Sequence, residues 1–239
     1  MAEAIKIDTL DCELKEAVLD KIPDANFDLC LTCGTCTGGC PASEQFGMDP
    51  RKLIRMLNFG MDEEILKSDW KWVCSMCGRC QLACPMNINI PKLIYSIRAK
   101  MAREKRPKGI LGSCDQHIRT GSAMGAAKED FTFTVLDVAE EIREEHPGFE
   151  DLEVTVDRVG AQMVLNQNSR EPVTEPEEMG PLWKVLHTVG ADWTYPSVMW
   201  AGENYCMFLA DDEGWRYIIE EFVLHVDNNL KSPLVVNTE

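Results

Sequence analysis

Two runs of cysteine share one spacing in this sequence, and their residue type and spacing are suited to metal chemistry. Each run reads C-x2-C-x2-C-x3-C and is followed at once by a proline, Pro41 or Pro85. Three cysteines at two-residue intervals can wrap one side of a four-iron cube, whose fourth corner then needs a ligand from elsewhere. The spacing is typical of [4Fe-4S] clusters. The first run is Cys30, Cys33, Cys36 and Cys40, and the second is Cys74, Cys77, Cys80 and Cys84.

Exchange of the fourth cysteine would supply the missing corner of each cube. In two-cluster proteins that carry this run, the last cysteine of each run binds the other cluster. We therefore predict two [4Fe-4S] clusters. The predicted ligands are Cys30, Cys33, Cys36 and Cys84 for one cluster, and Cys74, Cys77, Cys80 and Cys40 for the other. This exchange would hold the two loops together and couple folding to metal binding.

Zinc and disulfide bonds are the alternatives for these cysteines. Zinc sites usually pair two C-x2-C knuckles across a spacer and do not use a third closely spaced cysteine. Closely spaced thiols in a cytoplasmic protein stay reduced, which disfavours disulfides. Outside the runs, we expect Cys12, Cys114 and Cys206 to be buried or incidental thiols. Cys114 and His117 have a ligand-like spacing, but nothing nearby in the sequence completes a site.

Composition limits the partners and the compartment. The 239 residues are 45% apolar and carry a formal net charge of -16. Because phosphate binding depends on concentrated Lys and Arg, this charge argues against nucleic acid as a partner. No apolar run approaches the roughly 18 residues of a membrane-spanning helix, and the N-terminal stretch 1–10 is mixed and acidic. We expect a cytoplasmic protein without a transmembrane segment, with peripheral membrane contact left open.

Hydrophobic periodicity predicts an α+β protein with two domains. Domain 1–108 is expected to be helical around the clusters, and domain 109–239 to be a linker followed by an α/β segment with no catalytic constellation. The predicted helices are 11–22, 49–60, 90–106, 135–145, 182–189 and 215–226. The predicted strands are 152–156 and 233–236, the predicted linker is 109–127, and the predicted loop is 169–181.

The two runs with their flanks resemble the C subunit of heterodisulfide reductase. They read CLTCGTCTGGCPA from Cys30 to Ala42 and CSMCGRCQLACPMNINIP from Cys74 to Pro91. The resemblance covers roughly the first 105 residues and matches all eight cysteines to that family's cluster ligands. It implies a helical ferredoxin domain in a non-catalytic subunit of a hetero-oligomer. Electrons would pass from an A subunit, which bears a flavin and clusters, to a B subunit that carries out disulfide chemistry.

The second half has a resemblance of its own. The segment GADWTYPSVMWAGENYCMFLAD, from Gly190 to Asp211, is similar to the surroundings of the first cysteine-rich motif of the B subunit, where a CCG triplet holds an unusual cluster. This chain has no adjacent pair of cysteines, and Cys206 stands alone in the segment. The resemblance implies a degenerate module kept for docking. Enlarged C subunits of this kind resemble those of sulfur-oxidising bacteria, which implies a sulfur compound carried by a partner, with lipoyl groups as one option.

Two other functions remain open at this point. The chain could be the iron-sulfur subunit of a membrane-docked dehydrogenase related to the succinate or glycerol 3-phosphate enzymes. The C-x4-C-x2-C pattern of the extra [2Fe-2S] domain in succinate-type subunits is absent from the sequence. It could also be a docking module that clusters merely stabilise. Reversible reduction of the clusters would separate an electron carrier from such a module.

Overall fold

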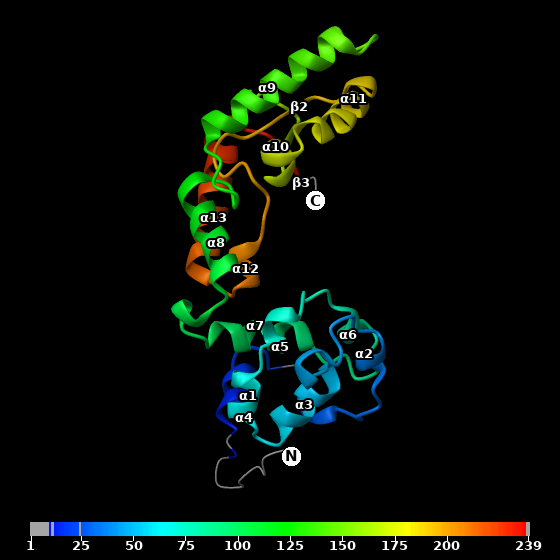
Figure 1. The fold of residues 1–239 in the computed structure, drawn as a ribbon, viewed down its shortest axis with the longest axis vertical. Helices are drawn as coiled ribbons and strands as arrows, with labels where there is room; N and C mark the ends of the chain where they lie inside the picture. The colour runs from blue at the N-terminus through cyan, green and yellow to red at the C-terminus, as the bar shows by residue number, and fades with distance from the viewer. Residues whose placement is uncertain (1–9, 11, 24, 238–239) are drawn as a thin grey trace. The chain divides into compact units, whose positions relative to one another are not determined.

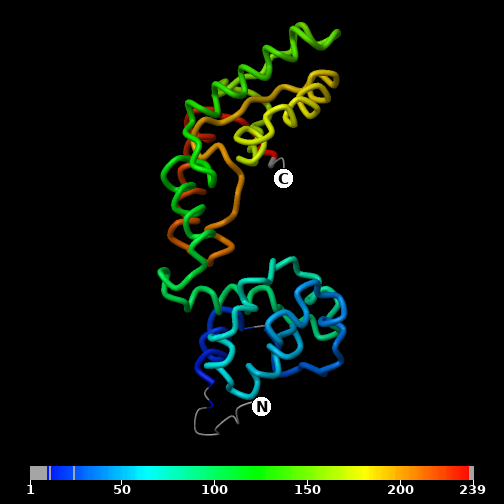
Figure 2. The backbone as a smooth tube through the Cα atoms, viewed as in Figure 1, coloured from blue at the N-terminus to red at the C-terminus, as the bar shows by residue number. Residues whose placement is uncertain are grey.

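The structure is a computed structural model that describes residues 10, 12–23 and 25–237, and it divides into two compact units. Unit 1 comprises residues 1–107 with 208–210, and unit 2 comprises residues 108–207 with 211–239. Figure 1 labels the elements of both units, and Figure 2 traces the chain through them. The N-terminal stretch that we searched for a secretion signal lies, except for Leu10, outside the described residues.

Unit 1 consists of short helices and connecting loops in its described part. Its elements are α1 (Glu13–Leu19), η2 (Phe27–Leu29), α2 (Thr35–Gly38), η3 (Gln45–Gly47), α3 (Pro50–Asn58), α4 (Asp62–Lys67), α5 (Trp70–Val73), α6 (Arg79–Leu82), α7 (Ile90–Ala99) and η4 (Arg103–Lys105). The two longest, α3 and α7, supply much of the core through Leu53, Ile54, Leu57, Leu93, Ile94 and Ile97. These apolar residues recur at helical spacing, so each helix turns one face inward.

Both helices begin at the predicted positions because their first turns are capped. The Asp49 carboxylate accepts a hydrogen bond from the Lys52 amide at 2.8 Å, and Pro50 occupies the first turn, where no amide hydrogen is needed. Before α7, the Asn89 side chain accepts from the Lys92 amide at 3.0 Å. The predicted helices 49–60 and 90–106 are therefore confirmed in position, although α7 ends at Ala99.

Unit 1 contains the same loop twice. In each cysteine run the residue before the second cysteine has a positive φ, 54° at Thr32 and 56° at Met76. The glycine after that cysteine also has a positive φ, 84° at Gly34 and 80° at Gly78, and it precedes a one-turn helix, α2 or α6. Glycine accepts this left-handed backbone without a Cβ clash. The repeated spacing in the sequence therefore corresponds to a repeated backbone conformation.

Unit 2 combines helices with a small parallel sheet. Its elements are α8 (Lys108–Thr120), α9 (Lys128–Glu145), β1 (Met163–Asn166), α10 (Arg170–Thr174), η5 (Pro176–Met179), α11 (Gly180–Thr188), β2 (Trp193–Thr194), α12 (Tyr205–Phe208, with Phe208 in unit 1), α13 (Asp212–His225), the π-turn η6 (Val226–Leu230) and β3 (Leu234–Asn237). The strand order is β2-β1-β3, and Met163 pairs with Trp193 on one side and Leu234 on the other. Figure 2 shows α10 and α11 beside α9.

An aromatic cluster fills the core of unit 2 between α9 and the sheet. Phe131 stacks on Trp200 with ring centroids 4.1 Å apart. The buried indole of Trp183 donates to the Tyr195 hydroxyl at 2.8 Å, and that hydroxyl donates to the Gln167 side chain at 2.9 Å. The polar atoms of Trp183 and Tyr195 are therefore paired, whereas the buried indole nitrogen of Trp200 has no hydrogen-bond partner among the described residues.

Several predicted elements of unit 2 are confirmed and three are wrong. The helices predicted near the ranges of α9, α11 and α13 form, and so does the final strand β3. The predicted linker at 109–127 is instead largely helix α8, where tertiary burial of Cys114 and His117 outweighs the low helix propensity of its glycines.

The other two errors concern short elements. The predicted strand 152–156 contributes a single bridge, from Val156 to Tyr195, whereas the central strand lies at β1. The predicted loop 169–181 contains α10 and η5. Hydrophobic periodicity carries little signal in elements this short.

The molecule as a whole still has the expected α+β class. None of its described helices is long and apolar enough to cross a lipid bilayer.

Candidate metal centres

The first cysteine run forms a pocket with the last cysteine of the second run. The pocket is lined on its apolar side by Ile54 and Ile88. Arg51 lies at its rim as an exposed cation. Its sulfur-bearing lining residues are Cys30, Cys33, Cys36, Cys84 and Met86.

The second run forms a matching pocket with the last cysteine of the first run. Trp70 and Val73 line it together with Pro50. Its sulfur-bearing lining residues are Cys40, Cys74, Met76, Cys77 and Cys80. Each pocket thus receives three cysteines from one run and one from the other.

Direct hydrogen bonds hold the two loops against each other. The buried Trp70 indole donates to the carbonyl oxygen of Ala42 at 2.7 Å, which ties the second run to the segment just after Cys40. Arg79 donates to the carbonyl of Gly39 at 3.2 Å. The one-turn helices α2 and α6 lie side by side (Figure 1). The loops therefore meet through contacts that Trp70 and Arg79 provide.

The inner thiols of both pockets resist ionisation. Burial, together with the neighbouring Cys74 thiol and with Cys40 from the other run, raises the pKa of Cys80 to about 12. Burial also raises the pKa of Cys36 and of Cys74. Thiolates crowded together in a low-dielectric pocket repel one another, so these groups need a compensating positive charge to ionise.

The outer thiols are easier to ionise. A hydrogen bond from the Thr35 side chain lowers the pKa of Cys33, and the two side-chain atoms lie 3.4 Å apart. A hydrogen bond from the backbone of Arg79 lowers the pKa of Cys77. In the second pocket the Met76 amide donates to the Cys74 sulfur at 3.4 Å. Amide and hydroxyl donors of this kind stabilise sulfur ligands that carry negative charge.

A buried arginine supports the second run. The Arg98 guanidinium, at the end of α7, is fully buried and donates to the carbonyl oxygens of Lys71 at 2.7 Å and Cys74 at 2.5 Å. A third bond, of 2.7 Å, goes to the carbonyl of Phe208 in the short segment 208–210 that belongs to unit 1. Burial lowers the pKa of Arg98 to about 10, so its side chain stays charged at neutral pH.

The donor set of each pocket fits a [4Fe-4S] cluster. Four thiols line each cavity, and soft thiolate ligands are those that iron-sulfur clusters take. No three His, Cys, Asp or Glu side chains among the described residues are arranged to hold a metal ion. The thiols instead lie along the walls of the two pockets, four in each.

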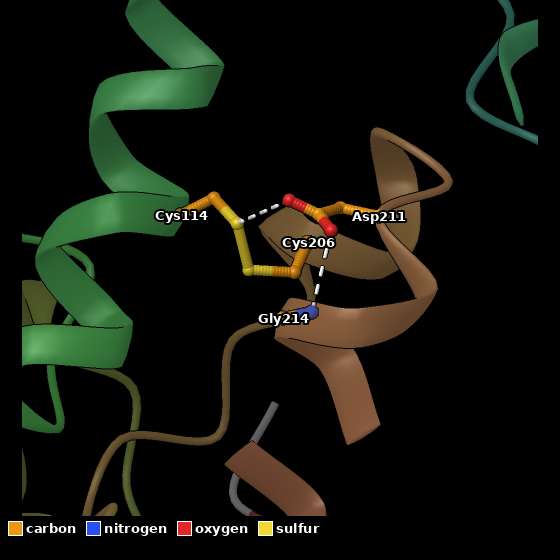
Figure 3. The surroundings of a disulfide bond; sticks show 4 residues. All are labelled: Cys114, Cys206, Asp211 and Gly214. Carbon is orange, nitrogen blue, oxygen red and sulfur yellow. Dashed lines mark hydrogen bonds between the residues drawn. A yellow bond between two sulfur atoms is a disulfide. The ribbon is translucent and has the colours of Figure 1, made fainter. Parts of the chain in front are cut away.

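The remaining cysteines depart from prediction in one respect. Cys114 on α8 and Cys206 on α12 are buried as expected, but they form a disulfide bond and are not thiols (Figure 3). Asp211 approaches the Cys114 sulfur at 3.8 Å and accepts a bond from the Gly214 amide at 3.3 Å. The two cysteines are 92 residues apart in the chain, so their spacing in the sequence gave no indication that they pair. Burial lowers the pKa of nearby His117 to about 4, which keeps it neutral.

Comparison with known proteins agrees with this site. Residues 26–88 match the family described as 4Fe-4S dicluster domain. The chain is 25% identical to the iron-sulfur C subunit of the CoB–CoM heterodisulfide reductase of Methanopyrus kandleri, over 76% of this chain and 84% of that protein. It is 32% identical to the C subunit of the H2:CoB-CoM heterodisulfide,ferredoxin reductase of Methanothermobacter marburgensis, over 41% of this chain and 53% of that protein.

A cysteine-lined pair of pockets within a dicluster domain defines an iron-sulfur protein that binds [4Fe-4S] clusters. The match to the Methanopyrus C subunit extends well beyond the dicluster domain. The match to the Methanothermobacter C subunit spans only about half the length of that protein. The chain is an electron-transfer protein that resembles the C subunit of heterodisulfide reductase, as its cysteine runs predicted.

Arg98, which bonds to the second cysteine run, is a residue of the site that the sequence analysis did not single out. Aligning Leu53-Ile54 of α3 with Leu93-Ile94 of α7 places Arg98 opposite Asn58. Both side chains donate to the carbonyl three residues before the first cysteine of a run, since Asn58 donates to Phe27 at 2.9 Å. An internal comparison of the two halves would have revealed the equivalence.

Proposed function

We propose that this chain relays electrons through two [4Fe-4S] clusters whose ligands are exchanged between the two cysteine runs. The observation that carries the proposal is the mixed lining of each pocket, three cysteines from one run and one from the other. The proposed ligands are Cys30, Cys33, Cys36 and Cys84 for the first site, and Cys74, Cys77, Cys80 and Cys40 for the second.

The clusters would supply reversible one-electron chemistry, and the protein would position and insulate them. Trp70, Ile54 and Ile88 limit the access of water to the pockets. Backbone and hydroxyl donors at Met76 and Thr35 stabilise the sulfur ligands. Because the two sites share their ligand loops, an electron can pass from one cluster to the other over a short path.

The partners we propose are the other subunits of a heterodisulfide reductase-like complex in the cytoplasm. The similar proteins are named as C subunits of heterodisulfide reductases, which supports a hetero-oligomer. Electrons would come from an A subunit that bears a flavin and iron-sulfur clusters, and they would pass to a B subunit of the CCG type. The reaction of the whole complex would involve a sulfur compound, and sulfur oxidation is the setting that the enlarged second half favours.

Within this proposal, domain 1–108 is the electron carrier and domain 109–239 is a docking module. The segment from Gly190 to Asp211 resembles the residues that surround a cysteine-rich motif of the B subunit, but it lacks the CCG triplet of that motif. Its one cysteine, Cys206, is bonded to Cys114. A cysteine in a disulfide offers no thiolate to iron, which supports a module that binds a partner and carries no cluster.

Metal analysis and redox titration test the proposal together. Purified without oxygen, the full chain should contain about eight iron and eight acid-labile sulfide per molecule, because each cluster brings four of each. Both clusters should accept electrons from a reduced flavoprotein partner and pass them to a disulfide-active partner. A zinc-filled protein without visible absorbance would refute the cluster assignment.

The two alternatives predict different behaviour in the same experiment. A cluster-stabilised docking module would contain the same iron but would not reduce and reoxidise at the potentials its partners use. An iron-sulfur subunit of a membrane-docked dehydrogenase would exchange electrons with a quinone-linked partner in place of a CCG protein. Copurifying subunits identify which of these partners is present.

A further inference from the structure

The duplicated architecture of unit 1 allows its two cluster sites to be compared position by position. Each cysteine run leads into a capped helix, α3 after the first and α7 after the second. Near the end of each helix, one side chain reaches back to the residue three positions before the first cysteine of the run that precedes it. Asn58 makes this bond to Phe27 at 2.9 Å, and Arg98 makes it to Lys71 at 2.7 Å.

The equivalent side chains differ in charge. Asn58 is neutral, whereas Arg98 is a cation that also bonds to the carbonyl of Cys74, the first ligand of the second run. Three hydrogen bonds of Arg98 go to carbonyl oxygens, which carry no net charge. The positive charge of Arg98 therefore lies at hydrogen-bonding distance from the backbone of Cys74, a proposed ligand of the second site.

The surroundings of Arg98 keep its charge from being screened. Its guanidinium lies 5.3 Å from the ring centroid of Trp72 and 3.9 Å from that of Phe208, and it is fully buried. Aromatic faces are favourable neighbours for a guanidinium, and these two rings lie against a side chain that is buried from water. With little water nearby, the effective dielectric constant is low and the charge acts strongly on its neighbours.

The exposed charged side chains near the two pockets are similar at both sites. Exposed Arg51 lies at the first pocket and exposed Arg79 at the second, and water screens both. Asp49 faces both sites, because it accepts a bond from Thr37 beside Cys36 while the adjoining Pro50 lines the second pocket. These groups do not favour either site clearly.

Lys71 is the remaining buried cation on the side of the second site. Its ammonium group donates to the carbonyl oxygens of Leu66 and Ser68 at 2.8 and 2.7 Å, and the nearby Asp69 carboxylate favours its charged form. Burial nevertheless lowers the pKa of Lys71, and the Asp69 side chain is exposed.

Lys71 and Arg98 are thus two buried cations whose equivalents at the first site, Phe27 and Asn58, carry no charge. Of the two cations, only Arg98 bonds to a proposed ligand residue, Cys74.

We propose that Arg98 makes the second site, held by Cys74, Cys77, Cys80 and Cys40, the higher in reduction potential of the two. This inference rests on the proposed function. Reduction adds one negative charge to a cluster, and a nearby buried cation stabilises the reduced form more than the oxidised one. An electron that enters the chain therefore comes to rest at the second site before it leaves.

Redox titration of the full chain, followed by electron paramagnetic resonance, tests the inference. The wild type should show two separate midpoint potentials. Cys33→Ser and Cys77→Ser replace one exposed ligand at each site and so assign the signals. The higher potential should belong to the signal that Cys77→Ser changes. Assignment of the higher potential to the signal that Cys33→Ser changes would overturn the proposal without any variant of Arg98.

The Arg98 variants then isolate the charge. Arg98→Gln should lower the higher potential and leave the lower one in place, whereas Arg98→Lys, which keeps the charge, should largely preserve the separation. Arg55→Gln removes an exposed cation from α3 and should move neither potential. Unchanged potentials in Arg98→Gln with a full iron content would refute this inference alone, while a protein that lacks clusters in the wild type would refute the proposed function.

Discussion

At the scale of single residues, the site depends on a few buried polar contacts between the two loops. Trp70 is the clearest case, since its indole is buried and bonds to the Ala42 carbonyl across the pair of runs. A buried carbonyl that loses its partner costs free energy because it also has no water. The hydrogen bond therefore stabilises the packing of the two cysteine loops against each other, and the same indole lines the second pocket.

Replacement of Trp70 by Phe should weaken the contact between the two cysteine loops. The variant keeps an aromatic ring but removes the N–H donor, and we expect unfolding to become easier by roughly 1–2 kcal/mol. Loss of visible absorbance on exposure to air should be faster than in the wild type. Trp215→Phe, the same chemical change on α13 of unit 2, is the control and should lose its clusters at the wild-type rate. Equal rates in both variants would mean that the Trp70 bond does not support the site.

The spacing of the cysteines predicts the cluster ligands, but no pattern in the sequence predicts the residues that surround them. Cysteine spacing is local information, because a cube binds three thiols from one short loop. Arg98 and the Cys114–Cys206 disulfide depend on contacts between segments that are far apart in the chain. No local pattern marks such contacts, so they became visible only with the fold.

At the scale of elements, the disulfide joins helices α8 and α12 within unit 2 (Figure 3). The bond closes a long loop, because its two cysteines are separated by 92 residues. In the chain-entropy view, closing a loop of this length limits the unfolded state strongly. In the oxidised protein the disulfide should therefore be a major contributor to the stability of unit 2, whereas a reducing compartment such as the cytoplasm would open the bond and remove this contribution.

The double variant Cys114→Ser with Cys206→Ser should lose this contribution. We expect the free energy of unfolding of unit 2 to fall by about 4 kcal/mol, measured from urea transitions followed by tryptophan fluorescence. Four of the six tryptophans, at positions 183, 193, 200 and 215, report on unit 2. Visible absorbance should show the clusters of unit 1 intact. An unchanged transition, or alkylation of both cysteines in the unreduced wild type, would contradict the bond.

Elements with strong local signals were predictable, and elements that depend on burial were not. The caps at Asp49 and Asn89 and the apolar faces behind them mark α3 and α7 in the sequence. Helix α8 has glycines at positions 109 and 112 and forms because its inner face is buried. Strand β1 spans only four residues, and its pairing partners β2 and β3 follow it at a distance along the chain.

At the scale of the whole molecule, the two units should depend on metal to different degrees. Unit 1 is built around pockets whose inner thiols repel one another when ionised. Unit 2 has an aromatic core and a disulfide of its own. Where a metal group joins loops, its binding free energy is part of the folding free energy.

Removal of iron should therefore loosen unit 1 and spare unit 2. After treatment with a strong iron chelator, hydrogen exchange should become much faster in peptides that cover α2 and α6. Peptides that cover α9 and α11 should keep their protection, and they serve as the internal control. Equal loss of protection in both units, or none in either, would show that the clusters are not what organises the two loops.

Exchange of ligands between the runs is the central claim, and cysteine variants test it most directly. Electron paramagnetic resonance of the reduced full chain should show that Cys40→Ser changes the same signal as Cys77→Ser. Cys84→Ser should change the same signal as Cys33→Ser, and Cys12→Ser, outside both runs, should change neither. If Cys40→Ser instead alters the signal that Cys33→Ser alters, each run binds its own cluster and the account is contradicted.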